Sequence, residues 1–191
     1  MSNDQAVTVA QAEADTRRWL ERAVIGLNLC PFAKAVHAKR LVHYAVYLPQ
    51  EEGELIDMLM AEAQALHTCA VSERDTTLLI APNTLADFLD FNDFVNRAER
   101  LLARAGFEGE LQLASFHPHF QFAGTEAGDM GNMTNRAPYP TLHLLREDSV
   151  SRAVAAFPDA EAIFGHNIQT LEELGPEGWA SLDVGPRGAS Q

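Results

Sequence analysis

The chain has 191 residues, 47% of them hydrophobic, which suits one domain with a substantial core. Its formal net charge of −13 at pH 7 repels nucleic-acid backbones and anionic lipid surfaces, so we expect neither as a partner. There is no apolar run near the roughly 20 residues of a membrane helix and no signal-peptide pattern. We therefore expect a cytoplasmic protein, with a flexible N-terminus over 1–12, a single domain over 13–180 and a flexible tail over 181–191.

Helices and strands are predicted to alternate along the first part of the chain. Some stretches carry apolar residues at helical spacing, and shorter runs have the β-branched or alternating pattern of strands. In chain order these are a helix over 13–27, a helical stretch over 32–40, a strand over 41–48, a helix over 54–70, a strand over 76–81, a helix from a capping motif at Thr84 to residue 105, and a strand over 111–116. This order indicates an α/β layered fold in which some strands are parallel.

The last third of the chain adds one ambiguous element and two helices. Residues 141–145 form either a fourth strand, in which His143 faces away from the leucines beside it, or the start of a helix. A short helix over 149–157 follows, and Asp159 is predicted to cap a further helix to Leu174, where a Gly-Pro pair ends it. We therefore expect a mixed or partly parallel sheet of about four strands, flanked by helices.

A long loop separates the strand over 111–116 from residues 141–145. From His117 to Pro140 there is little periodicity, and glycines and prolines mark turns. Connections of this length in compact domains are typically functional or disordered, and apolar anchors such as Phe120 and Met133 argue against disorder. The loop also begins at the carboxyl end of a strand, where α/β sheets bind ligands. It is predicted to be an ordered loop that presents polar side chains.

The two cysteines, Cys30 and Cys69, lie far apart in unlike contexts, so no disulfide is expected in a reducing compartment. Cys30 precedes Pro31 at the predicted start of a helix, where the helix dipole commonly lowers the pKa of a thiol. Its apolar neighbours favour an ordinary packing role. Both interpretations stay open for Cys30, whereas Cys69 is predicted to fill the core.

Four segments carry a family resemblance: LNLCPFA at 27–33, SFHPHFQFAG at 115–124, NMTNRAPYPTLHLLRE at 132–147 and NIQTL at 167–171. Together they resemble a bacterial family of unknown function, domain of unknown function 1415, over nearly the whole chain. The resemblance implies that the motif positions are His117, Pro118, Asp129, Asn132, Asn135, Arg136, Pro138, Pro140, His143, Arg146 and Glu147. His119 stands where the family pattern also has other residue types. Because the family has no established activity, the resemblance implies where a site lies and leaves its chemistry open.

A metal site is the first hypothesis for the loop. His117 and His119 would lie on the same side of an extended segment, and His143 or Asp129 would complete three ligands and leave a position open for water. Such ligands suit a divalent zinc, iron or manganese ion as cofactor. The spacing is not a diagnostic motif, so ordinary hydrogen bonding of these histidines is the alternative.

An anion site is the second hypothesis. Arg136 can hold a carboxylate or phosphate in bidentate fashion, and nearby amides add donors. The alternative is an Arg136 that pairs with Asp129 or Glu147 and holds the loop together. The candidate substrate-binding residues are Asn132, Asn135, Arg136 and Arg146.

A third hypothesis joins Cys30 as nucleophile to His117 or His143 as base. Taken together, the residues favour an enzyme, a hydrolase or group transferase, that acts on a small anionic metabolite, with Cys30, His117 and His143 as the catalytic candidates. The alternative is a non-catalytic sensor of a small ligand or metal, or an interaction module anchored by the aromatic residues of the loop. The dense mixture of His, Asp, Asn and Arg favours catalysis.

Overall fold

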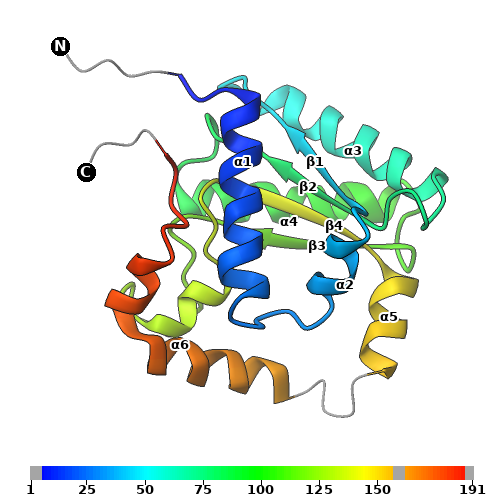
Figure 1. Cartoon of the computed structure of the whole chain (residues 1–191). Helices are drawn as coiled ribbons and strands as arrows, with labels where there is room; N and C mark the ends of the chain where they lie inside the picture. The colour runs from blue at the N-terminus through cyan, green and yellow to red at the C-terminus, as the bar shows by residue number, and fades with distance from the viewer. Residues whose placement is uncertain (1–5, 157–161, 188–191) are drawn as a thin grey trace.

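A computed structural model describes residues 6–156 and 162–187 and confirms the layered α/β fold. Within these residues the sheet has the order β1-β2-β4-β3 (Figure 1). Its strands are β1 (Val42–Val46), β2 (Thr76–Ile80), β3 (Leu111–Phe116) and β4 (Thr141–Arg146). β1 and β2 are parallel, whereas β4 lies between β2 and β3 and is antiparallel to both. The sheet is therefore mixed, and the ambiguous stretch over 141–145 is a strand.

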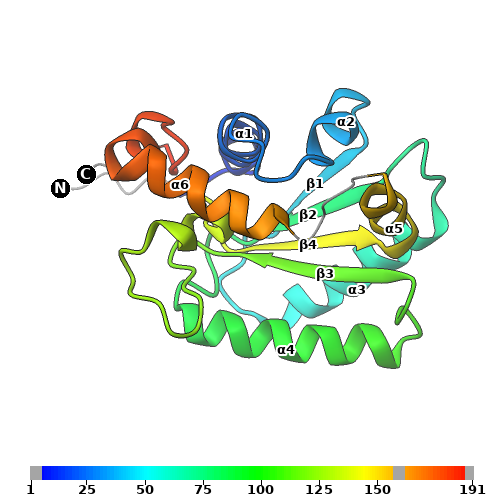
Figure 2. The same cartoon turned by 90° about the horizontal axis from the view of Figure 1, so that it is seen from below.

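Helices cover both sides of the sheet (Figure 2). They are α1 (Val9–Trp19), a π-helical turn η1 (Leu20–Ile25), α2 (Ala33–Ala38), α3 (Gly53–Thr68), α4 (Phe88–Arg104), a 3-10 helix η2 (Met130–Asn135), α5 (Glu147–Ala155) and α6 (Ala162–Ser181). α1, α2 and α6 lie on one side, which we call the α1 face, and α3 and α4 lie on the other, the α4 face. α5 follows β4 at the end of the sheet away from the long loop.

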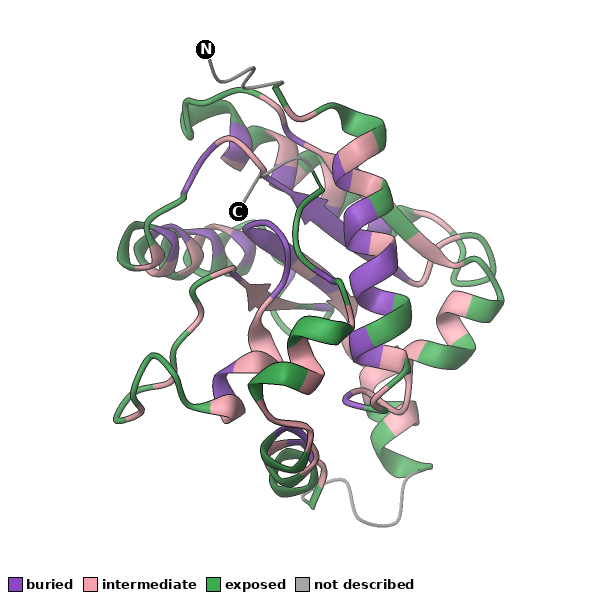
Figure 3. Ribbon diagram, turned by 60° about the vertical axis from the view of Figure 1, so that its left-hand side comes forward, coloured by how far each residue is buried: buried purple, intermediate pink, exposed green. Residues whose placement is uncertain are grey.

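The α4 face carries the main apolar core. Strand side chains alternate between the two faces, so Leu142 and Leu144 of β4 point to the α4 face and His143 points to the α1 face. Leucines of α3 and two phenylalanines of α4, Phe91 and Phe94, pack on this side. Each such fully buried side chain contributes about 1.5–3 kcal/mol. Figure 3 shows that buried residues gather in the strands and on the helix sides that face them.

The start of α4 differs from the prediction. Asp87, not Thr84, is the N-cap, and its carboxylate accepts hydrogen bonds from the backbone N–H groups of Leu89 at 2.8 Å and Asp90 at 3.1 Å. Leu85 just before it has a positive φ of 57°, which is incompatible with an α-helix. The helix therefore begins at Phe88 because a carboxylate cap follows a left-handed residue.

Both ends of the described chain make contacts that local sequence patterns did not indicate. α1 begins at Val9, with Thr8 as its N-cap, inside the stretch expected to be flexible. Near the C-terminus, Arg18 of α1 donates to the carbonyl oxygens of Asp183 at 2.7 Å and Gly185 at 2.6 Å. The part of the expected tail up to residue 187 is thus bound to α1.

Two further expectations concern α6. The predicted cap Asp159 lies outside the described residues. At the predicted stop, Gly175 has a φ of 67° and breaks the helix, but a further helical segment then continues to Ser181. In the described part of the chain, no helix has both the length and the apolar character that a membrane crossing requires.

Candidate functional site

His117 follows β3 and points to the α4 face, where it is fully buried against Phe88 and Phe91. Its Nδ1 accepts the backbone N–H of His119 at 3.0 Å. Its Nε2 lies 3.0 Å from the carbonyl oxygen of Leu85, which can only accept, so Nε2 carries the proton. Burial lowers the pKa of His117. Both ring nitrogens are therefore occupied in a neutral ring, which leaves no lone pair for a proton or a metal.

The loop residues expected to bind a ligand hold the loop itself together. The buried Asn132 accepts from Phe122 N at 2.9 Å and Thr125 Oγ1 at 3.0 Å, and it donates to Glu126 O at 2.8 Å. The Asp129 carboxylate accepts from Glu126 N at 2.9 Å. Asn135 donates to the carbonyl oxygen of Ser115 at 3.2 Å. Their polar groups thus make local hydrogen bonds that order the loop.

The two predicted substrate-binding arginines lie at opposite ends of β4. Arg136 precedes the strand and donates through Nε to Phe120 O at 3.1 Å and through Nη2 to Ala127 O at 2.7 Å. Arg146 ends the strand and donates to Cys69 O at 2.7 Å and Arg74 O at 3.1 Å. Arg146 therefore braces the turn after α3, and the structure does not bring it to the loop.

The hypothesised metal ligands are not assembled. His117 points to the α4 face and His143 to the α1 face, and the exposed His119 and Asp129 lie along the loop. Among the residues that the structure describes, no three His, Cys, Asp or Glu side chains come close enough to hold a metal ion. Side chains alternate between the two faces of the sheet, and this alternation places His117 and His143 on opposite faces. The metal hypothesis required the two rings to lie together.

His143 has a different environment from His117. Its Nε2 lies 2.6 Å from Thr76 Oγ1, and that hydroxyl donates its own hydrogen to Leu144 O at 2.7 Å. Thr76 must therefore accept from His143, which places the ring hydrogen on Nε2 and leaves a lone pair on Nδ1. Nδ1 has no hydrogen-bond partner among the described residues. Burial lowers the pKa of His143 to about 4, so the ring is neutral at pH 7.

Cys30 belongs to the same side of the molecule. Like Tyr44 and Phe116, it packs against a cluster of buried residues beneath α1 that includes Trp19 and Val24. The Phe116 ring lies 6.1 Å from that of His143. The Cys30 side chain is partly exposed and makes no hydrogen bond to another described residue. The sulfur of Cys69, in contrast, lies within hydrogen-bonding distance of Leu66 O, Arg74 O and the Arg146 guanidinium. Only Cys30 keeps an unengaged thiol.

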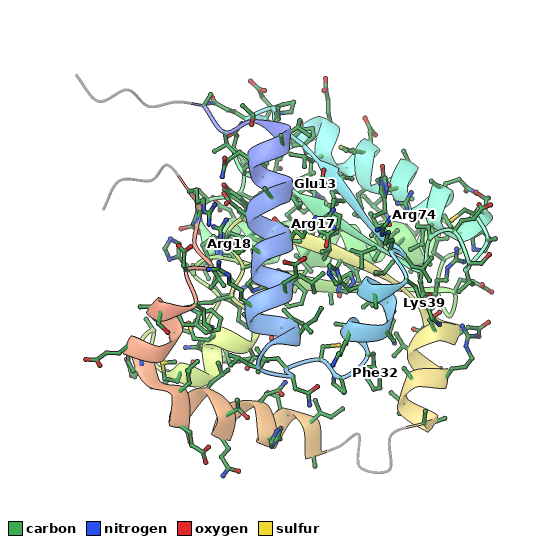
Figure 4. All side chains as sticks on the ribbon, in the orientation of Figure 1. Glu13, Arg17, Arg18, Phe32, Lys39 and Arg74 are labelled. Atoms are coloured by element: carbon green, nitrogen blue, oxygen red, sulfur yellow. The ribbon has the colours of Figure 1, made fainter. Side chains whose placement is uncertain are left out.

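The backbone around Cys30 is irregular. The π-helical turn η1 ends α1, and Asn28 then has a positive φ of 55°. Phe32, two residues after the cysteine, lies at the start of α2 (Figure 4). π-helical turns and left-handed residues of this kind frequently occur at functional sites, because the surrounding structure must compensate their cost. The helical pattern of the sequence did not indicate this irregular backbone over 20–32 around the candidate Cys30.

Two further polar residues on this side were missed by sequence reasoning. Asn167 of α6 is buried and donates to Leu29 O at 2.8 Å, next to Cys30, but its Oδ1 has no partner among the described residues. The Tyr44 hydroxyl on β1 is also buried without a partner there. The Arg17 guanidinium lies 4.4 Å from the centre of the Tyr44 ring. Burial raises the pKa of Tyr44 to about 12. A sequence signal for Asn167 does exist. This residue lies four residues after Ile163 and four before Leu171, and this helical spacing indicates that its side chain points inward.

Comparisons with known proteins give a family and no function. No curated protein and no solved structure matches the chain. A family model described as "Protein of unknown function (DUF1415)" matches residues 11–181 of the 191, from α1 to the end of α6. This confirms the resemblance carried by the segments around Cys30 and the loop. The chain belongs to the DUF1415 family.

Proposed function

We propose that the protein is an enzyme, a hydrolase or group transferase acting on a small molecule, with Cys30 as nucleophile and His143 as base. The observation that carries this proposal is the state of the His143 ring. It is neutral, its orientation is fixed through Nε2, and it keeps a free lone pair on Nδ1. His117, the other catalytic candidate, has no free nitrogen and serves the loop instead.

Thr76 supports the role of His143 as base. A nucleophile and its base typically depend on a third group that orients the base. Here the Thr76 hydroxyl, itself fixed by Leu144 O, holds Nε2 and so fixes the direction of Nδ1. A pKa near 4 keeps Nδ1 unprotonated across the physiological range, so this nitrogen is free to accept a proton.

The proposed reaction has two steps, and Cys30 and His143 carry out the bond changes and proton transfers of both. In the proposed first step the Cys30 sulfur attacks an electrophilic carbon, His143 Nδ1 takes the thiol proton and then passes it to the leaving group, and a covalent intermediate forms. In the second step water or an acceptor hydroxyl or amine attacks that carbon. His143 takes its proton and returns it to the departing sulfur. Water as acceptor gives hydrolysis, and any other acceptor gives group transfer.

Thiol alkylation by iodoacetamide tests this assignment without knowledge of the substrate. Cys69→Ser leaves Cys30 as the only thiol, and Cys30→Ser leaves Cys69 as the matched control. We expect Cys30 to react faster than Cys69 at pH 7, and His143→Gln to slow the Cys30 reaction roughly tenfold or more, because general-base assistance contributes at least that much. The reaction is followed by intact-protein mass spectrometry.

Two outcomes would contradict the proposal. If Cys30 reacts no faster than Cys69, Cys30 is not the nucleophile. If His143→Gln leaves the rate of Cys30 alkylation unchanged, His143 is not its base. The melting temperature of Cys30→Ser is a further check, since a site thiol is replaced with little change in stability. A large decrease would support the packing role instead.

A further inference from the structure

Arg136 carries a positive charge that no carboxylate compensates within the described residues. Two arginines that are nearly buried, Arg18 and Arg74, have such a partner. Arg18 forms an ion pair with the buried Asp15 at 2.7 Å, and Arg74 forms one with Glu62. Arg136 is partly buried, and this burial lowers the pKa of its guanidinium, as expected for a cation without a neighbouring anion.

Arg146 is the closest comparison, because it also bonds to carbonyl oxygens and has no carboxylate partner in the described chain. Its acceptor Cys69 is the C-cap of α3, where the helix dipole supplies a partial negative charge. The acceptors of Arg136, Phe120 and Ala127, lie in turns of the loop and belong to no helix. Arg136 therefore lacks the compensation that Arg146 receives.

The hydrogen bonds of Arg136 leave one edge of the guanidinium free. Nε and Nη2 each donate to a carbonyl, and Nη1 makes no hydrogen bond within the described residues. The second N–H of Nη2 and the facing N–H of Nη1 form a fork whose spacing matches two oxygens of a carboxylate or phosphate. Because the loop holds itself together through Asn132, this fork is fixed before any ligand arrives.

The loop that carries Arg136 also carries aromatic rings. Phe120, whose carbonyl binds Arg136, has its ring 4.9 Å from that of Phe122, and Phe122 lies 5.9 Å from Phe164 of α6. Phe164 is 55% exposed, which is unusual for a phenylalanine. The loop and α6 thus bring aromatic rings together in the part of the structure that holds Arg136, which suits a ligand with an anionic group on an apolar body.

We propose that the loop between β3 and β4 contains a binding site for the carboxylate or phosphate group of a small ligand, with Arg136 as its anchor. This site goes beyond the proposed cysteine chemistry and does not depend on it. The anion site is compatible with an enzyme that binds an anionic metabolite and also with a non-catalytic ligand-binding module.

Side-chain NMR of the unmodified protein tests the site directly. The Nε–H signals of Arg136 and Arg146 are assigned by Arg136→Lys and Arg146→Lys. Sodium phosphate and sodium benzoate are then titrated at constant ionic strength, with sodium chloride as the salt control. We expect a saturable shift of the Arg136 signal with phosphate or benzoate, no such shift with chloride, and no saturable shift of Arg146. A lower dissociation constant for benzoate would reflect the aromatic surface.

Arg136→Lys keeps the charge but lacks the fork, and we expect its affinity for the two anions to fall roughly tenfold, as for the loss of a charge-assisted bidentate contact. Arg146→Lys should retain the affinity. An Arg136 signal that shifts linearly without saturation, or that shifts equally in chloride, would overturn the proposal. Equal saturable shifts of Arg136 and Arg146 would also overturn it, because they would indicate weak general anion binding.

Discussion

The two faces of the sheet treat a buried histidine in opposite ways. His117 on the α4 face has both nitrogens occupied and packs between two phenylalanines, so its ring acts as a polar core residue. His143 on the α1 face has one nitrogen fixed by Thr76 and the other free. Burial and a lowered pKa are common to both rings. The number of occupied nitrogens, not the burial, therefore separates a packing histidine from a candidate base.

The same difference extends to other residues of the two faces. The buried side-chain oxygens that lack a partner in the described chain belong to Thr16, Tyr44 and Asn167. All three lie on α1, α6 or the α1 face of β1, and none lies on the α4 face. Native proteins pair nearly all such groups, so an accumulation on one side indicates where a ligand or ordered water completes the structure.

Replacement of His117 should have the largest effect on stability. His117→Ala removes a fully buried ring and two hydrogen bonds, and it leaves the Leu85 carbonyl without a donor. We expect a loss of about 4 kcal/mol in the free energy of unfolding, measured by urea denaturation. His143→Ala should cost less than half as much, because its ring makes one hydrogen bond where that of His117 makes two. Equal losses for the two variants would contradict the distinction between the faces.

The second-largest effect should be the pH dependence of stability that the lowered pKa of His143 causes. Its pKa is about 4 in the folded protein and near 6.5 in the unfolded chain, so the unfolded state binds the proton first as the pH falls. The stabilisation present above pH 6.5 is therefore lost between pH 6.5 and 4, by about 3 kcal/mol in total. We expect the free energy of unfolding of the wild type, relative to His143→Gln, to fall by this amount over that window.

His143→Gln serves as the reference because its amide can still donate to Thr76. The titration of His117 and of the carboxylates is common to both proteins and cancels in the difference. A difference that stays constant from pH 7 to pH 4 would show that the folded and unfolded states bind the proton of His143 alike. The ring would then be solvated, and its environment would not differ from that of an exposed histidine.

Local patterns in the sequence predicted the fold well. The strand over 111–116 has the predicted bounds, and the fully buried β2 follows from a continuous apolar run. The predicted start of a helix was less accurate where the sequence offers two possible N-caps, as Thr84 and Asp87 do before α4. The order at the C-terminal end depends on Arg18 and Asp15, which bind residues far along the chain. Contacts of that separation leave no signal in local periodicity.

The candidate site was harder to predict than the fold, because it depends on where side chains point as well as on their position in the sequence. The loop was correctly placed after β3, but its polar residues mostly bind one another. His117 and His143 were grouped by sequence proximity, whereas strand alternation sends them to opposite faces. Thr76 lies 67 residues from His143 and joins it only through the pairing of β2 with β4. A pattern search along one stretch cannot find such a partner.

Two tyrosines provide the finest test of the comparison. The Tyr139 hydroxyl donates to the buried Asp15 at 2.8 Å, whereas the Tyr44 hydroxyl is buried without a partner in the described chain. Tyr139→Phe should lower the free energy of unfolding by about 1–2 kcal/mol, because a charge-assisted hydrogen bond is lost.

Tyr44→Phe should leave stability unchanged or raise it by about 1 kcal/mol, because an unpaired hydroxyl no longer has to be desolvated. Thermal and urea denaturation of both variants measure the contrast. A loss of stability in Tyr44→Phe equal to that in Tyr139→Phe would mean that ordered water pairs the Tyr44 hydroxyl in solution. If Tyr44→Phe is instead stabilising, the hydroxyl is kept at a cost to the fold, as expected of a group that serves the site.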